Sequence, residues 1–184
     1  MISDKIKEAM QKGQETIPYQ EVFEALNKAK IDYLVCGGAA VVMLGFSRLT
    51  VDLDIIASLE KDNLRNLYNV LKKLSYKPNI PIGEEEFIQK ENLNKLAREK
   101  NMKVVSFYNT KDPFKVIDIG VNLPDIPKIL KNKKYIKIKN ISIPIIFIDD
   151  LIKMKRDLAR PQDLIDVENL KRIKKQKYEK KKKV

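Results

Sequence analysis

The sequence predicts one α/β (or α+β) domain in which helices flank a small mixed β-sheet. Short apolar runs rich in β-branched residues alternate along the chain with segments whose apolar residues have helical spacing. The 184 residues, 43% of them hydrophobic, are enough for a single domain with its own core. We expect this domain to cover residues 1–170, and residues 171–184 to form a basic C-terminal tail.

In the first half of the chain, apolar runs predict strands over residues 31–36 and 48–57. Helices are expected over residues 3–13, 18–30, 39–44 and 58–74. An apolar stripe that begins at Val22 supports the second of these helices, because it gives the helix one face to bury. Gly45 closes the third helix, and Ser58 is the predicted N-cap of the fourth.

In the second half, four more strands are expected, over residues 103–108, 115–121, 135–139 and 141–148. The last two form a hairpin about Asn140. Helices are expected over residues 84–100, 125–131 and 150–159, the last of them capped by Asp149. Pro161 begins a final helix that runs into the tail, since proline is well tolerated in the first turn of a helix.

The composition excludes several kinds of chemistry. The chain has no histidine and a single cysteine, Cys36. Ser-His-Asp and Cys-His hydrolysis, zinc sites built on His or Cys, internal disulfides and histidine acid–base catalysis are therefore excluded. Catalysis has to use carboxylates, lysines, tyrosines, hydroxyls or a metal ion bound by oxygen. Carboxylate oxygens suit Mg²⁺ or Mn²⁺.

The formal net charge of +12 is concentrated at the C-terminal end. Residues 171–184 contain nine Lys or Arg and one acidic residue, so this tail carries +8. It is either a solubilising end without a partner or a contact for nucleic acid phosphates. No apolar run has the length of a membrane span, and the N-terminus lacks the apolar region of a signal peptide, so we expect a cytoplasmic protein without membrane contact.

Four polar residues occur at period two in the predicted strand over residues 48–57: Arg48, Thr50, Asp52 and Asp54. Alternate side chains of a strand share a face, so the two carboxylates should lie side by side, with the apolar residues between them on the other face. Neighbouring carboxylates repel at neutral pH unless a positive charge lies between them, which points to a divalent metal. Just upstream, Gly37 and Gly38 offer backbone N–H groups to a phosphate.

A third carboxylate, Asp118, lies inside a run of β-branched residues in the predicted strand over residues 115–121. Aspartate is depleted in strands, so its presence there indicates a function. If this strand lies beside the strand of Asp52 and Asp54, the three carboxylates can hold two metal ions about 4 Å apart. The alternative is an aspartate on an edge strand that faces water.

In this order along the chain, the features resemble the DNA-polymerase-beta-like nucleotidyltransferase superfamily. Members carry Gly-Gly or Gly-Ser, then Asp-x-Asp on a strand, then a third acid, which correspond here to Gly37-Gly38, Asp52-x-Asp54 and Asp118. The resemblance implies a nucleotidyltransferase-like fold and transfer of a nucleoside monophosphate from an NTP, with Mg²⁺ or Mn²⁺ as cofactor. It also implies that the three aspartates bind the metal ions and that Asp118 serves as general base.

The same resemblance implies nucleotide binding by five residues: Gly37, Gly38, Arg48, Thr50 and Lys155. The glycines would hold the triphosphate, and the lysine would reach the phosphates. The arginine and threonine occupy the positions where minimal members carry Arg-x-Thr before the acids. Many members follow the glycines with a serine or threonine, where this chain has Ala39, which removes one hydroxyl donor.

Residues 149–155 and 160–166 look like the ending of minimal, stand-alone members, including the toxin component of abortive-infection-type toxin–antitoxin pairs. This implies an RNA or protein hydroxyl as acceptor and an antitoxin as a further partner. The basic tail favours RNA. The alternative function is a catalytically inactive nucleotide- or RNA-binding module of the same fold, which Ala39 favours.

Some of these residues also have structural interpretations. Arg48 can neutralise Asp52 instead of contacting a substrate, and Lys155 can belong to a solvated basic face of its helix. Asp163 can pair with Arg160, or lie in the first turn of the last helix, where the helix dipole favours an acid. We expect a structural role of this kind for Asp163.

Overall fold

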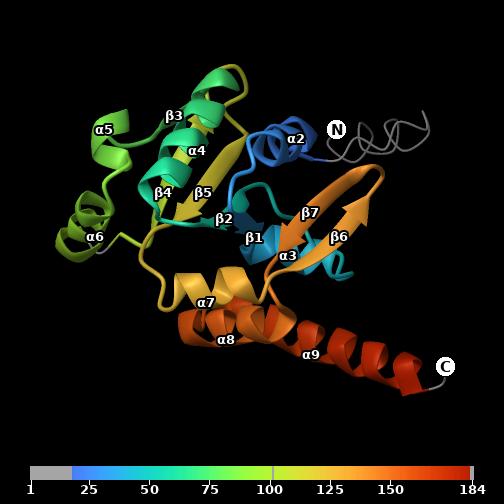
Figure 1. The fold of residues 1–184 in the computed structure, drawn as a ribbon. Coiled ribbons are helices and arrows are strands. Elements are labelled where there is room, and N and C mark those ends of the chain that lie inside the picture. Colours follow the sequence, from blue (N-terminus) through green and yellow to red (C-terminus); the bar gives the residue numbers. More distant parts are fainter. Residues whose placement is uncertain (1–17, 101, 183–184) are drawn as a thin grey trace.

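The structure, a computed structural model, describes residues 18–100 and 102–182, in which seven strands form one sheet and eight helices surround it (Figure 1). The strands are β1 (Tyr33–Val35), β2 (Leu53–Ala57), β3 (Tyr76–Pro78), β4 (Val104–Asn109), β5 (Val116–Gly120), β6 (Lys134–Ile138) and β7 (Ile141–Ile145). The helices are α2 (Gln20–Lys28), α3 (Gly37–Met43), α4 (Lys61–Lys73), α5 (Glu84–Phe87), α6 (Lys90–Glu99), α7 (Ile126–Lys131), α8 (Ile148–Leu158) and α9 (Pro161–Lys182).

The sheet has the strand order β3-β4-β5-β2-β1-β7-β6. Two neighbouring pairs are parallel, β2 with β5 and β1 with β7, and the other four are antiparallel. Strand β2 is central, and its register with β5 places Asp54 opposite Asp118. The predicted α/β class with a small mixed sheet is therefore confirmed.

Apolar faces of the helices build the core against this sheet. Helix α2 buries Val22, Phe23 and Leu26, as its predicted stripe requires, and α4 buries three leucines at helical spacing. Three aromatic rings join α4, α5 and β4: Tyr68, Phe87 and Phe107. Helices α8 and α9 contact each other, and the last turns of α9 extend away from the sheet (Figure 1). Of the described helices, none combines the length and apolar character that crossing a membrane requires.

The strand predicted over residues 48–57 is shorter than expected. Strand β2 covers only its second half, and residues 46–52 form an irregular segment. Leu49 and Val51 are 85% and 54% exposed, so the predicted alternation between core and surface is wrong for them. A strand needs neighbours to bond its backbone, and the ladders from β1 and β5 reach only to Ile55 and Leu53.

Three helices begin differently from the predictions. Helix α3 starts at Gly37, so the two glycines form its first turn instead of preceding it. Ser58 does not cap α4: its hydroxyl accepts the N–H of Glu60, which is itself the N-cap residue. Helix α8 begins before Asp149, which lies in its first turn, where the helix dipole favours an acid.

Two further differences lie between residues 75 and 100. Strand β3 was not expected, because a proline such as Pro78 usually interrupts a strand. The strand lies at the edge of the sheet, where the missing N–H of the proline costs little. The helix predicted over residues 84–100 is divided into α5 and α6. The helix predicted over residues 3–13 lies outside the described residues. The remaining predicted elements are present, with ends shifted by a few residues.

Candidate functional site

Asp54 and Asp118 come from adjacent parallel strands at directly opposed positions. Opposed residues of a parallel pair point to the same face of the sheet, so the two carboxylates share a face. The main chain of Asp54 is fixed by the Cys36 N–H, which donates to its carbonyl oxygen at 2.9 Å. Its Oδ2 accepts the Gly38 N–H at 3.3 Å. The strand adjacency that the sequence could only assume is confirmed.

Asp52 belongs to the same group of charges although it lies outside β2. It occupies the bend just before the strand and is exposed. Partial burial raises the pKa of its carboxyl, and the negative charge of Asp118 raises that pKa further. The three predicted acids therefore act on one another electrostatically.

The surroundings of Asp54 disfavour its ionised form. Burial raises its pKa most, the charges of Asp118 and Asp52 add to the rise, and the Gly38 hydrogen bond and the charge of Lys155 oppose it. Within residues 18–100 and 102–182, no Lys or Arg forms an ion pair with any of the three carboxylates. Their mutual repulsion is thus only weakly compensated by the chain itself.

The two glycines allow the first turn of α3 to approach these side chains. Gly37 has φ +58°, in the left-handed region that glycine adopts without strain, and a Cβ there would lie 1.9 Å from Asp54 Oδ2. A Cβ at Gly38 would lie 2.6 Å from Thr50 Oγ1 and 2.7 Å from Arg48 Nη2. The predicted glycine pair therefore has a steric reason, and it brings Arg48 and Thr50 to the same helix end as Asp54.

The donor set fits a divalent cation bound by oxygen. Oδ1 of Asp118 is buried and has no hydrogen-bond partner. A buried polar atom in this condition is costly unless a donor or a cation reaches it. Carboxylate oxygens are ligands that Mg²⁺ and Mn²⁺ favour. In the described part of the chain, no three acidic or cysteine side chains are already grouped closely enough to hold an ion, so the metal stays a prediction.

A second cluster of charges lies where α8 and α9 meet the segment before β2. Asp166, fully buried on α9, accepts hydrogen bonds from Arg48 Nη1 at 2.6 Å and from Gln162 Nε2 at 3.2 Å. Lys155 Nζ on α8 lies 2.7 Å from Asp166 Oδ2 and 2.9 Å from Asp163 Oδ1. Each buried charge in this cluster therefore has at least one partner of opposite sign.

Asp163 has the structural role expected of it. Its Oδ2 accepts a hydrogen bond from Arg160 Nε at 2.6 Å, as one of the two interpretations predicts. Burial raises the pKa of this carboxyl, but the hydrogen bonds from Arg160 and Lys155 outweigh burial, and the resulting pKa is below the usual aspartate range. The ionised form of Asp163 is thus favoured, in contrast to that of Asp54.

Arg48 and Lys155 differ from the structural alternatives considered for them. Arg48 pairs with Asp166 and not with Asp52, and Lys155 is 4% exposed and not part of a solvated face. Both remain close to the carboxylate site, since Arg48 Nη2 contacts the first turn of α3 and the charge of Lys155 acts on Asp54. Their part in nucleotide binding stays a prediction.

Sequence reasoning missed Tyr19. Its hydroxyl oxygen lies 2.8 Å from the carbonyl oxygen of Val51 and 2.9 Å from that of Val116, next to the segments that carry the acids. These partners are 32 and 97 residues away along the chain. No local pattern marks a tyrosine that makes such contacts, because they depend on the order of the strands.

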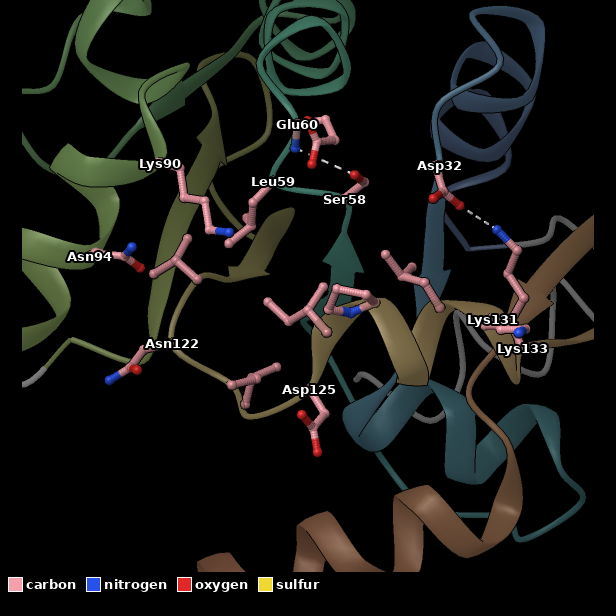
Figure 2. Close-up of a pocket in the computed structure, with 15 residues that line it drawn as sticks. Asp32, Ser58, Leu59, Glu60, Lys90, Asn94, Asn122, Asp125, Lys131 and Lys133 are labelled. Atoms are coloured by element: carbon pink, nitrogen blue, oxygen red, sulfur yellow. Dashed lines mark hydrogen bonds and ion pairs between the residues drawn. The ribbon is translucent and has the colours of Figure 1, made fainter.

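A hollow of about 690 Å³ lies at the other end of β2 and β5 (Figure 2). Its walls include the segments that follow these two strands, together with parts of α6 and α7. Lysines and acids are mixed in it, among them Lys90, Lys131, Glu60 and Asp125. None of its lining residues belongs to the predicted site, so the hollow and the carboxylates are separate features of the molecule.

No family model matches the sequence, and no curated protein matches it. Solved structures do match the fold. The lincosamide antibiotic adenylyltransferase LnuA, with lincomycin bound, has a TM-score of 0.55 at 18% identity, over 84% of this chain and 96% of that chain. A proposed nucleotidyltransferase of Thermotoga maritima has a TM-score of 0.51 at 13% identity, over 87% and 90%.

An antigenic nucleotidyltransferase-like protein of Paracoccidioides brasiliensis has a TM-score of 0.51 at 14% identity, over 81% of this chain and 71% of that chain. Likeness at these identities concerns the fold. The chain has the nucleotidyltransferase fold that the resemblance implied. The relation to toxins stays a prediction.

Proposed function

We propose that this chain is a metal-dependent nucleotidyltransferase, which moves a nucleoside monophosphate from an NTP to an acceptor hydroxyl. The observation that carries the proposal is the β2–β5 register, which sets Asp54 opposite Asp118 on one face of the sheet. Oδ1 of Asp118 is buried without a partner, and the pKa values of Asp52 and Asp54 are raised. Three such carboxylates need added positive charge to be stable together.

Asp52, Asp54 and Asp118 would hold Mg²⁺ or Mn²⁺. When bound, the cation would offset the charge of the triphosphate and favour ionisation of the acceptor hydroxyl. The acceptor oxygen forms a bond to the α-phosphorus, and the bond from that phosphorus to the oxygen it shares with the β-phosphorus breaks. Pyrophosphate leaves with that electron pair, and the hydroxyl proton passes to Asp118 as general base.

The donors at the start of α3 would hold the triphosphate. The Gly38 N–H, the Thr50 hydroxyl and the Arg48 guanidinium lie close together there. Arg48 is fixed in this place by its ion pair with Asp166, so it is oriented before a nucleotide arrives. Lys155 would support the site by charge, since its charge already opposes the rise in the pKa of Asp54 while it pairs with Asp166.

We propose RNA as the acceptor. Helix α9 continues without a break from the domain into the basic segment, and its last turns extend away from the sheet (Figure 1). Arg172 and Lys175 are exposed on it, and residues 171–184 carry +8. A helical arm with this charge suits the phosphates of a polynucleotide better than a protein surface of mixed charge.

The experiment is transfer of label from each α-³²P-NTP, with Mg²⁺ or Mn²⁺, into the RNA and protein of a cell extract. Wild type is compared with Asp52→Asn/Asp54→Asn and with Asp62→Asn, a matched control whose side chain is 95% exposed in α4. Label in RNA that requires the site aspartates and survives in the control is the expected result. Label only in protein would overturn the RNA acceptor, and no label with any NTP would overturn the transfer reaction.

The basic arm is tested separately with Arg172→Gln/Lys175→Gln. We expect the KM for RNA to rise several-fold near physiological salt, because two phosphate contacts are lost. The KM for NTP is expected to stay unchanged, since both side chains are exposed on α9 and neither belongs to the proposed nucleotide site. An unchanged KM for RNA would leave the arm a solubilising end.

A toxin role follows from the resemblance alone and is also proposed here. Induction of the wild-type chain should arrest growth, and Asp52→Asn/Asp54→Asn should not. An antitoxin partner would be a co-expressed chain that restores growth.

The second candidate function, a nucleotide- or RNA-binding module without activity, is favoured by Ala39, which gives no hydroxyl next to the glycine pair. It predicts that NTP raises the melting temperature although no label is transferred.

A further inference from the structure

The hydroxyl of Tyr19 lies between the two segments that carry the site carboxylates. It accepts the N–H of Val116 at 3.1 Å. Its oxygen is also 2.9 Å from the Val116 carbonyl and 2.8 Å from the Val51 carbonyl, so its single proton is shared between two acceptors. Val51 directly precedes Asp52, and Val116 lies two residues before Asp118.

This hydroxyl takes the place where the ladder between β2 and β5 would continue. The register ends with Leu53 opposite Ile117, so the next pair would be Asp52 and Val116. Val116 instead gives both its N–H and its C=O to Tyr19. Asp52 consequently leaves the sheet in a bend, while Asp54 stays in the strand. The Tyr19 side chain thus ends the β2–β5 ladder at a point between Asp52 and Asp54, the two carboxylates that the sequence places at period two.

Tyr19 is held firmly enough to act in this way. It precedes α2, and its carbonyl oxygen accepts the N–H groups of Val22 and Phe23, both of which are fully buried. Its φ is +58°, a conformation that costs free energy for any residue except glycine and persists where its surroundings enforce it. The ring is partly buried against the core, so the hydroxyl has a fixed position.

We propose that Tyr19 is a positioning residue for Asp52: its hydroxyl holds the β2–β5 ladder open and keeps the Asp52 carboxylate off the sheet, within reach of a cation shared with Asp54 and Asp118. The inference rests on the proposed function, because the placement matters to a shared cation. It adds a residue from outside both sequence motifs to the working parts of the site.

The test uses Tyr19→Phe in the full chain, which keeps the ring and removes the hydroxyl. The matched control is Tyr33→Phe, which loses a hydroxyl that lies 3.2 Å from Asn27 Oδ1. The first readout needs no metal: amide hydrogen exchange at Val116 should become at least about tenfold faster in Tyr19→Phe alone, because its N–H loses its partner. The second is the Mg²⁺ concentration that gives half of the Mg²⁺-induced rise in melting temperature.

We expect that Mg²⁺ concentration to rise about tenfold in Tyr19→Phe and to stay unchanged in Tyr33→Phe. The kcat at saturating Mg²⁺ should change by less than about threefold, since Asp118, the proposed base, stays in place. Unchanged Mg²⁺ dependence in Tyr19→Phe, while Asp54→Asn abolishes the Mg²⁺ response, would overturn the inference and leave the proposed function standing. A full Mg²⁺ response in Asp54→Asn would overturn the proposed function itself. A Tyr19→Phe chain that no longer folds would make Tyr19 a determinant of stability and so contradict the inference.

Discussion

Two clusters of charged side chains lie next to each other in this molecule and are organised in opposite ways. In the cluster of α8 and α9, Asp163 and Asp166 are at most 2% exposed, and each has cationic partners. In the cluster of β2 and β5, Asp54 and Asp118 lie side by side on one face of the sheet, and the described residues place no Lys or Arg in an ion pair with them.

The pKa values follow this difference. The pKa of Asp163 is lowered by its hydrogen bonds to Arg160 and Lys155, although burial opposes the change. The pKa of Asp54 is raised, by burial first and by Asp118 next. A buried carboxylate with its own counter-charge supports the fold, whereas one without a counter-charge reduces stability until something external binds it. The comparison indicates which aspartates serve the structure and which serve a ligand.

The largest expected effect is on activity and comes from Asp54→Asn. Transfer should fall by at least about a thousandfold, because a metal ligand contributes several kcal/mol to lowering the barrier. The melting temperature without metal should rise by a few degrees, since a charge that burial disfavours is removed and the Asn oxygen still accepts the Gly38 N–H. Label transfer and calorimetry of the same preparations measure both. A lower melting temperature would contradict the proposed lack of compensation.

The counterpart in the balanced cluster is Asp166→Ala. We expect the free energy of unfolding to fall by about 3–5 kcal/mol, because Arg48 loses its partner and Lys155 keeps only one of two. Urea unfolding measures the change. An effect below 1 kcal/mol would show that the buried pairs contribute little, and the contrast between the two clusters would then fail.

Gly37→Ala connects the fold to the carboxylate site. The added methyl lies where Asp54 Oδ2 is now, and the positive φ adds strain. We expect a loss of about 1–2 kcal/mol in stability together with loss of the Mg²⁺-induced rise in melting temperature. Gly45→Ala is the control, with φ +115° and open space around the added carbon. It should lose stability and keep the Mg²⁺ response; loss of that response in both variants would argue against a specific contact with Asp54.

Protonation affects the two clusters with opposite signs. Asp54 has a raised pKa in the folded state, so its ionisation lowers stability, and acidification through that pKa should restore stability in the metal-free protein. Asp163 has a lowered pKa, so its stabilisation is present above the unfolded pKa and is lost as the pH falls through the folded pKa, below about 4. Melting temperatures from pH 7 to pH 3 measure both. Asp54→Asn should remove the first change and leave the second.

The smallest expected effect comes from Arg160→Gln. The Arg160 side chain is 70% exposed, and Asp163 keeps Lys155 when the arginine is removed. We expect a loss of about 0.5 kcal/mol, measured by urea unfolding beside Asp166→Ala. A loss as large as that of Asp166→Ala would mean that exposure does not separate the members of this cluster.

Local patterns in the chain were enough to predict the fold class, most of the elements and the residue types of the candidate site. Apolar periodicity is a local property, and it predicts strands and helices without knowledge of their neighbours. The absence of histidine restricts the chemistry in the same local way, and the order Gly37-Gly38, Asp52-x-Asp54 and Asp118 is visible in the chain. That the strands of Asp54 and Asp118 are adjacent was only an assumption at the level of the sequence, and the structure confirms it.

The surroundings of each charge depend on contacts between distant parts of the chain. The partner of Arg48 is Asp166, 118 residues away, and not the nearby Asp52. The strand predicted over residues 48–57 begins only at Leu53, because just upstream of it Tyr19 bonds the main chain of Val51 and Val116. The physical reason is that the pKa, stability and availability of a buried charge depend on atoms within a few ångströms, and the strand order brings those atoms together from distant parts of the chain.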